Sequence, residues 1–456
     1  MHRFKPLVAA LALLLAAPLS ALANPEIEKL RAEFEQKLRA LQDSYDTRLK
    51  QMEGRMAQTD DKAQAAQTTA DQAARTPVSQ SAFNPEISLI MMGRYAHMKD
   101  IDERGITGFV PGADAHGGPA RGFSFDEIEL VMSASIDPYF RGNLNLIVAD
   151  GEVAVEEAWF QTTALGRGLT AKGGRFRSGI GYQNEQHPHA WDFANNTLMY
   201  QTLFGEAFAH DGVQLKWLAP TETFLEFGLE AGRGQSFPGS ETGGNRNGAG
   251  ALAAFAKIGG DVGASNSWRA GLNNLTAKPK AREAHLQDTN NVEGLTEFTG
   301  KSNTWIADFV WKWAPLGNPK YQNLKLQAEY FRRNENGNLA CADNTAIGGA
   351  CTGLTDAYRS KQSGLYAQSI YQFMPRWRVG YRYDRLDSGS VSFGANPLGH
   401  TDYNPVKHSL IADYSSSEFS RFRLQLARDK SMQGVTDNQV TLQYVHSLGP
   451  HGAHKF

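Results

Sequence analysis

Residues 126–136, DEIELVMSASI, alternate between two kinds of side chain. Every second residue from Ile128 to Ile136 is apolar, whereas Glu127 and Glu129 lie on the opposite face. A period of two predicts a β-strand. A strand buried in a protein core has no use for carboxylates, and an ordinary surface strand needs no such continuous apolar face. The stretch therefore predicts a strand whose two faces meet different solvents.

The same alternation continues through the rest of the chain. Residues 304–313 oppose Trp305, Phe309 and Trp311 to Asp308 and Lys312. Further alternating segments occupy residues 222–231, 323–330, 377–384 and 421–426. In total the pattern predicts sixteen strands, which begin near residues 86, 123, 142, 153, 169, 212, 222, 250, 267, 303, 322, 362, 377, 406, 420 and 438.

The lengths of the connections distinguish the two ends of these strands. Connections after even-numbered segments are short, such as APT and MPR, and those after odd-numbered segments are mostly long. Short turns at one end and long loops at the other are typical of transmembrane β-barrels. A sheet in hydrocarbon must close, because no edge can stay unpaired there. We therefore predict an all-β transmembrane barrel of about sixteen antiparallel strands, which leaves a water-filled channel. Its apolar face meets lipid, and Glu127 and Glu129 face the lumen.

The N-terminal region predicts export and then a helix. Residues 1–23 have a charged start, an apolar run and the small residues Ala21 and Ala23, which predict a cleaved signal peptide. An uncleaved anchor helix is the alternative. Residues 24–59 repeat apolar positions at spacings of three and four, which predicts a self-associating α-helical coiled coil in the periplasm. The alternative is a helix that packs on its own domain. Residues 60–83 then form a linker, and residues 84–456 the barrel.

Composition excludes several functions and predicts one cross-link. The net charge of -2 offers no basic face for a nucleic acid. Cys341 and Cys351 are the two cysteines, and in an exported chain they are expected to form a disulfide. No nucleophile elbow or HExxH motif is present, so we expect neither an enzyme nor a cofactor.

The overall organisation resembles the phosphate-selective porin O and P superfamily. The resemblance rests on the signal peptide, the predicted coiled coil, the sixteen strands, the terminal Phe456 and residues 174–215, where GRFRSGIG leads into a long loop and then a Gly-Val strand. It implies a homotrimer in the outer membrane of a Gram-negative bacterium. It also implies that the loop after the fifth strand folds inward and narrows each pore.

The charges assigned to the lumen do not predict a strong anion field. The nine basic residues are Arg175, Arg177, Lys216, Lys312, Lys325, Arg378, Arg382, Arg421 and Arg423. The eight acidic residues are Glu127, Glu129, Glu157, Glu226, Glu230, Asp308, Glu329 and Asp384. An anion pore would favour rings of Arg or Lys with few carboxylates. Grouped arginines opposite grouped acids predict a transverse field. The best candidates for selectivity are Arg175 and Arg177, beside the long loop.

The long loop also carries candidate metal ligands. His187, His189 and Asp192 have the side chains that bind zinc-type cations, but a polar loop that lines the constriction is the favoured explanation of them. The sequence thus favours an outer-membrane porin for small hydrophilic solutes or ions, phosphate among them. A metal or cation uptake pore is the first alternative. A structural membrane anchor with a periplasmic stalk is the second.

Overall fold

The computed structural model describes the barrel almost completely. The described residues are Lys29, Gln36, Lys37, Arg39 and Asp43, which are helical, and residues 85–101, 104–109, 120–149, 151–342 and 348–449. The predicted signal peptide, the linker and nearly all of the predicted coiled coil lie outside them. The chain divides into two compact units, Met1–Ala82 and Phe83–Phe456. None of the helices among the described residues is long and apolar enough to cross a membrane.

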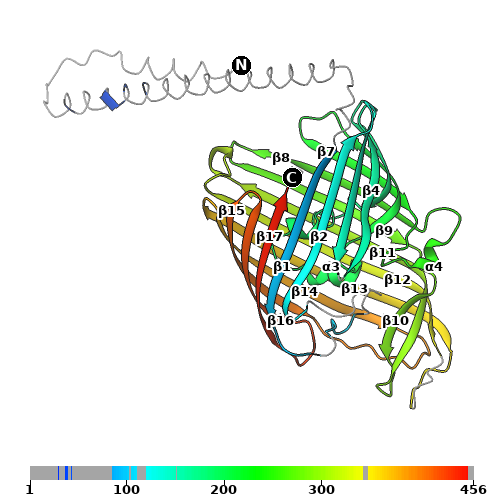
Figure 1. The fold of residues 1–456 in the computed structure, drawn as a ribbon. Helices are drawn as coiled ribbons and strands as arrows, with labels where there is room; N and C mark the ends of the chain where they lie inside the picture. The colour runs from blue at the N-terminus through cyan, green and yellow to red at the C-terminus, as the bar shows by residue number, and fades with distance from the viewer. Residues whose placement is uncertain are drawn as a thin grey trace, which may run out of the picture. The chain divides into compact units, whose positions relative to one another are not determined.

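The second unit consists almost entirely of antiparallel strands (Figure 1). The first nine are β1 (Glu86–His97), β2 (Gly122–Ser135), β3 (Phe140–Ala149), β4 (Glu152–Thr162), β5 (Leu169–Arg177), β6 (Ala209–Leu218), β7 (Phe224–Gly232), β8 (Ala251–Val262) and β9 (Asn266–Ala277). The others are β10 (Arg282–Gln287), β11 (Glu293–Trp313), β12 (Asn323–Cys341), β13 (Thr355–Met374), β14 (Trp377–Ser392), β15 (Val406–Ser417), β16 (Ser420–Lys430) and β17 (Asp437–Leu448). Short helical segments are η3 (Pro188–Ala190), α3 (Leu198–Phe204), α4 (Glu241–Gly244) and η4 (Pro315–Gly317).

Sixteen of the seventeen strands form a closed ring. Within the ring each strand pairs with the next one in the chain, except that β9 pairs with β11 in place of β10, and β1 pairs with β17 to close the barrel. The prediction of a closed antiparallel barrel of sixteen strands is confirmed. The sequence missed β10, which pairs only with the outer part of β11 and extends the wall beyond the ring.

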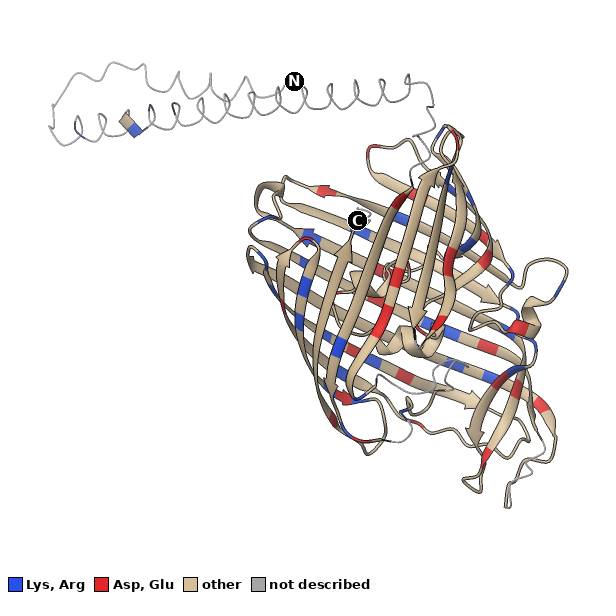
Figure 2. Cartoon of the chain, in the orientation of Figure 1, with Lys and Arg blue, Asp and Glu red and all other residues tan. Residues whose placement is uncertain are grey.

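The barrel is polar inside and apolar outside. On β16 the side chains of Arg423 and Gln425 are buried, whereas Leu424 and Leu426, which alternate with them, are exposed. Strand β17 repeats this order, with burial alternating at every residue up to Tyr444. Figure 2 shows the charged residues spread along the strands of the ring. This inverted pattern is that of a barrel with lipid outside and water inside.

The opening stretch follows the same rule. Glu129 is buried inside the barrel, and the register places Ile128, Leu130 and Met132 on the face shared with Val148, Leu146 and Leu144 of β3. Connections at one end are short, and most at the other end are long. The connection between β3 and β4 is an exception, because β3 ends at Ala149 and β4 begins at Glu152.

The loop that joins β12 to β13 contains the cysteines. Cys341 ends β12, and a disulfide links it to Cys351, with the two Cα atoms 5.4 Å apart. Both side chains are buried in an apolar cluster with Phe298, Leu339 and Tyr358. The cross-link therefore fastens this loop to the extended walls of β11 and β13.

Candidate functional site

The connection between β5 and β6 lies inside the barrel. We call residues 178–208 the inner loop; it contains η3 and α3. The Thr197 hydroxyl caps α3 by accepting a hydrogen bond from the Tyr200 amide, and Gly205 ends the helix in the left-handed conformation. Figure 1 shows α3 within the ring of strands. The inward fold that the family resemblance implies is thus present in the structure.

An apolar cluster attaches the inner loop to one side of the wall. Buried members from the loop are Ile180, Leu198, Met199, Tyr200, Leu203, Phe204 and Phe208. They pack against wall residues that include Phe255, Leu275, Ile306, Phe331 and Leu386. Burying one such side chain contributes about 1.5–3 kcal/mol. The helix α3 is therefore held mainly by packing, on the side formed by β8 to β14.

Buried carboxylates hold the backbone of the loop. Glu329 of β12 accepts hydrogen bonds from the amides of Tyr182 and Gln183, at 3.2 and 2.8 Å, and from the Tyr200 hydroxyl at 2.9 Å. Asp384 of β14 accepts one from the Leu198 amide at 3.1 Å. These wall acids thus act as anchors for the loop and are not free charges in the lumen.

A basic wall on β14 and β16 holds the next part of the loop. The guanidinium groups of Arg382, Arg421 and Arg423 donate to the carbonyl oxygens of Asn195, His189 and Trp191, at 2.8, 2.7 and 3.1 Å. All three side chains point inward, as predicted.

Asp192 joins the basic wall. Its carboxylate pairs with Arg378 at 3.1 Å and with Lys325 of β12. Burial raises the pKa of Asp192, but Lys325 and Arg378 outweigh this effect and hold the pKa well below its usual range. The ionised carboxylate of Asp192 therefore attaches the loop to the basic wall.

An acidic wall faces the other side of the loop, and two β-bulges build it. Between β3 and β4 the register passes from Asn145↔Glu157 to Leu146↔Val155, so Glu156 is an extra residue. Both Glu156 and Glu157 contact His187. A similar shift in β2 leaves Asp126 unpaired, and Asp126 forms an ion pair with Arg94 of β1 at 2.8 Å. Bulges re-aim side chains in this way beside functional sites.

The inner loop brings two histidines to the acidic wall. His187 Nδ1 lies 3.2 Å from Glu129 Oε1 and 2.9 Å from Glu156 Oε2, and its Nε2 lies 3.3 Å from Glu157 Oε2. His189 Nδ1 lies 2.6 Å from Glu129 Oε2. We call Glu129, Glu156, Glu157, His187 and His189 the Glu–His cluster.

The charge on His187 follows from these contacts. Burial and the nearby Arg177 guanidinium lower the pKa of His187, but Glu156 and Glu157 outweigh both and raise it to about 10. In the absence of another cation, the ring is protonated at neutral pH and bridges the carboxylates.

Two sequence predictions of the site need correction. Arg175 was expected in the lumen, yet it pairs across the sheet with Asp211, on the outer face that also carries Val213. The pairing of β5 with β4 ends at Arg175, and β5 then turns inward. Arg177 therefore does reach the lumen, where it contacts Glu156 and the Gln186 carbonyl oxygen.

The predicted metal ligands do not gather as a triad. His187 and His189 meet at the acidic wall, but Asp192 is bound by Lys325 and Arg378 on the other side of the loop. Sequence alternation also missed Glu156, because it assigned adjacent residues to opposite faces. The consecutive glutamates in EVAVEEAWF were the available signal.

Known structures of similar shape are outer-membrane proteins. A loop L8 deletion mutant of OmpT, an outer membrane protein of Vibrio cholerae, has 10% identity, a TM-score of 0.49 and coverage of 80% of this chain and 99% of that one. The outer membrane channel DcaP of Acinetobacter baumannii has 13% identity, a TM-score of 0.49 and coverage of 81% and 99%. The anion-selective porin from Comamonas acidovorans has 10% identity, a TM-score of 0.47 and coverage of 80% and 99%.

Sequence comparison gives a family. No family model matches the sequence, so the resemblance to the phosphate-selective porins stays a prediction. An uncharacterised protein of Aquifex aeolicus (strain VF5) is 30% identical over 406 residues, which are 84% of this chain and 82% of that protein. The chain therefore belongs to the same family as this Aquifex aeolicus protein.

Proposed function

We propose that this protein is an outer-membrane porin, in which small hydrophilic solutes or ions pass through a water-filled lumen narrowed by the inner loop. The observation that carries the proposal is the arrangement of charge inside a closed barrel. Glutamates of β2 and β4 face one side of the inner loop, and arginines of β14 and β16 face the other. A barrel that served only as an anchor would need no ionised groups on opposite walls.

The two walls differ in how completely their charges are paired. On the basic wall, Asp413 accepts from both Arg378 and Arg423, at 2.8 and 2.9 Å. Within the described residues Arg421 has no carboxylate partner and donates to a carbonyl oxygen. On the acidic wall, Glu127, Glu129, Glu156 and Glu157 share Arg177 and two histidines. We infer a transverse field that orients dipolar solutes, with no strong preference for phosphate or other anions.

We infer a homotrimer, in which the β4–β9 side of the barrel forms the contact. A nine-residue strand such as β5 is about 30 Å long. A tilt of about 40° reduces its height to about 23 Å, slightly below the ~25 Å apolar band. By contrast, β11 and β13 have 21 and 20 residues. The low part of this side is β5 to β7, which have nine, ten and nine residues, and it is protected from lipid when other subunits cover it.

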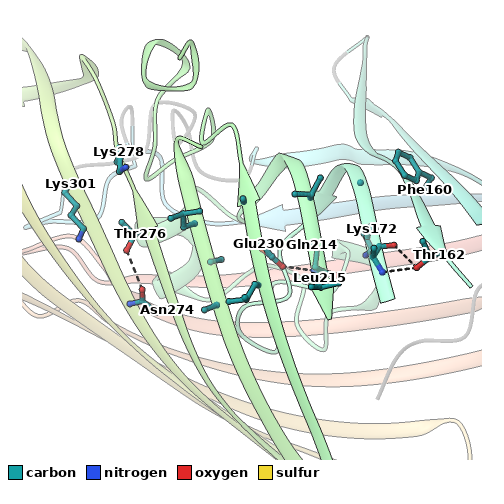
Figure 3. A pocket seen from close by; sticks show the side chains of 18 residues that line it. Phe160, Thr162, Lys172, Gln214, Leu215, Glu230, Asn274, Thr276, Lys278 and Lys301 are labelled. Carbon is teal, nitrogen blue, oxygen red and sulfur yellow. Dashed lines mark hydrogen bonds between the residues drawn. The ribbon is translucent and has the colours of Figure 1, made fainter. Parts of the chain in front are cut away.

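The low wall also carries a hollow with polar groups at its edge (Figure 3). The hollow has a volume of about 930 Å³, and its apolar lining includes Leu215 and Leu229, which are exposed on the outer face. At one edge the Asn303 amide donates to the Thr276 hydroxyl at 2.8 Å. Polar groups on an outer face cost energy against hydrocarbon, and a neighbouring subunit supplies a better environment.

A cation pore is the second candidate, and the Glu–His cluster favours it. Its three glutamates, with Glu127 of β2 nearby, gather beside a single arginine. Carboxylates at a constriction attract cations. The two candidates share the same barrel and differ in whether it prefers cations or has no strong ion preference.

Planar bilayers test the proposal and separate its alternatives. We expect discrete ohmic current steps from the purified protein. Under a salt gradient, the porin reading predicts a reversal potential near zero, and the cation-pore reading predicts a clear cation preference. Absence of any conductance in correctly folded protein would leave the membrane anchor as the better account.

A further inference from the structure

We propose that Glu129, Glu156 and His187 form a binding site for a divalent transition-metal ion such as Zn²⁺. The oxygen and nitrogen atoms of these three side chains all lie within 4.8 Å of one another. They come from β2, β4 and the inner loop, so a bound ion would join both strands to the loop. The ligand set differs from the one that the sequence predicted, because Asp192 is absent and two glutamates replace it.

The spacing of the ligand atoms fits a tetrahedral ion. Zn–N and Zn–O bonds of about 2.0–2.1 Å place neighbouring ligands of a tetrahedron about 3.3 Å apart. His187 Nδ1 lies 3.2 Å from Glu129 Oε1 and 2.9 Å from Glu156 Oε2. Small side-chain movements therefore suffice to admit an ion between them. His189, whose Nδ1 lies 2.6 Å from Glu129 Oε2, is close enough to serve as a fourth ligand.

The second nitrogen of His187 has the partner that metal-binding histidines need. Its Nε2 lies 3.3 Å from Glu157 Oε2. Metal-bound histidines usually donate their other ring N–H to a carboxylate, which fixes the tautomer and orients the ring. The bulge in β4 therefore supplies one ligand, Glu156, and the orienting group for another, Glu157.

Two buried acceptors around the cluster lack donors. Asn145 is 2% exposed and donates through Nδ2 to Glu129 Oε1 at 2.6 Å, but its Oδ1 accepts no hydrogen bond. Glu127 Oε1 is likewise buried without a partner. Buried polar atoms are nearly always satisfied, by water or an ion if not by protein. A tetrahedral ion held by Glu129, Glu156 and His187 keeps one water in its fourth position when His189 does not bind it, and that water would be a donor beside these atoms.

The charge of the surroundings favours a cation. Four carboxylates, those of glutamates 127, 129, 156 and 157, outnumber the two permanent cations that act on them, Arg177, which pairs with Glu156, and Lys172. A divalent ion would compensate this excess. Borderline-soft N and O ligands suit Zn²⁺, Cu²⁺, Ni²⁺ and Co²⁺ better than Mg²⁺ or Ca²⁺, which prefer oxygen alone.

Metal binding by the purified full chain in detergent tests this site. After treatment with a chelator, titration calorimetry with Zn²⁺ is expected to give one site per chain, and Co²⁺ is expected to give the visible absorption bands of tetrahedral coordination. E156Q and H187A are expected to lose at least tenfold in affinity. E157Q, which alters the group that orients His187 and not a ligand, is expected to lose about 10–100-fold in affinity.

A matched control and a folding check keep the test decisive. H285A removes a histidine that pairs with a glutamate in the outer hairpin, where His285 Nδ1 lies 3.1 Å from Glu293, and it should bind Zn²⁺ like the wild type. Heat-modifiable migration on gels reports whether each variant is folded. Absence of binding in folded wild type, or equal binding in folded H187A, would overturn the site. The metal-binding measurement does not depend on ion conduction. A negative result would therefore overturn the metal site without overturning the proposed channel.

Discussion

At the scale of single residues, the described lumen is a set of ion pairs that hold the inner loop. Asp192 is the clearest case, because its carboxylate joins Lys325 and Arg378 to the loop. Removing one partner of a buried pair leaves the other charges uncompensated. Single substitutions at these positions should therefore change both the field in the lumen and the attachment of the loop.

D192N should shift the ion preference towards anions. The substitution keeps the size of the side chain but frees two positive charges, on Lys325 and Arg378. Reversal potentials under a salt gradient measure the shift. D211N is a matched control, because Asp211 pairs with Arg175 on the outer face. An equal shift in both variants would contradict the assignment of Asp192 to the lumen.

The contribution of Asp192 to stability should depend on pH in the acid range. Its pKa is lowered in the folded protein, so its stabilising effect is complete above the unfolded value of about 3.9. The effect is lost as the pH falls below that value towards the folded pKa. Thermal unfolding of wild type and D192N should differ most at neutral pH and converge in strong acid. A constant difference from pH 7 to pH 2 would argue against this linkage.

At the scale of secondary-structure elements, sequence periodicity predicts regular strands well and irregular ones poorly. Period-two alternation located the starts of all sixteen barrel strands to within about ten residues, β11 being the furthest off because it continues outward to pair with β10. It missed β10 because this six-residue strand has only two apolar side chains, Ala284 and Leu286. It missed Glu156 because a bulge depends on how the partner strand pairs, which no local pattern records.

The inner loop was foreseeable as a feature but its contacts were not. The sequence marked its histidines and aspartate as functional candidates. It could not predict that His187 contacts the acidic wall whereas Asp192 contacts the basic wall. That separation depends on β2, β4, β12 and β14, which lie far apart in the chain. Arg175 was misplaced for a similar reason, since the alternation rule assumes that β5 stays in the sheet to its end.

R382A should loosen the inner loop. The Arg382 guanidinium donates to the carbonyl oxygens of Asn195 and Asn196 and pairs with Asp384. Its loss leaves Asp384 without this partner and costs about 3–5 kcal/mol. We expect noisier single-channel currents and a lower unfolding temperature. R385A, on the exposed face of β14, is the control; if its current noise rises as much, the loop is not the source.

Reduction of the disulfide should leave conduction unchanged. The disulfide joins Cys341, the last residue of β12, to Cys351, and both lie in an apolar cluster that contains no residue of the inner loop. A cross-link that closes so short a loop contributes about 2–3 kcal/mol. We expect faster proteolysis within residues 342–354 after reduction, with single-channel conductance as before. A changed conductance would mean that this loop reaches the pathway.

At the scale of the whole molecule, the proposed trimer gives different surroundings to different sides of the outer wall. The hollow on the β4–β9 side should be covered by protein, and the β14–β17 side by lipid. An added bulky side chain is tolerated in fluid lipid but not in a packed protein interface. A pair of alanine-to-tryptophan variants can therefore distinguish the two sides.

A231W should disrupt the trimer, and A412W should not. Ala231 lines the hollow on β7, whereas Ala412 of β15 pairs with Leu424 on the outer face of the opposite side. Both changes add the same bulk at an outward-facing alanine. Light scattering of detergent-solubilised protein gives the oligomeric state of each variant. If both variants stay trimeric, or both dissociate, the β4–β9 side is not the contact surface.

The central claim is that the closed barrel encloses a water-filled pathway across a membrane. Its most direct test is the current through a planar lipid bilayer after addition of the purified, folded protein. The account predicts stepwise, ohmic conductance increases, with an ion preference that D192N moves towards anions and D211N leaves unchanged. Folded protein that inserts into the bilayer and carries no current would contradict it.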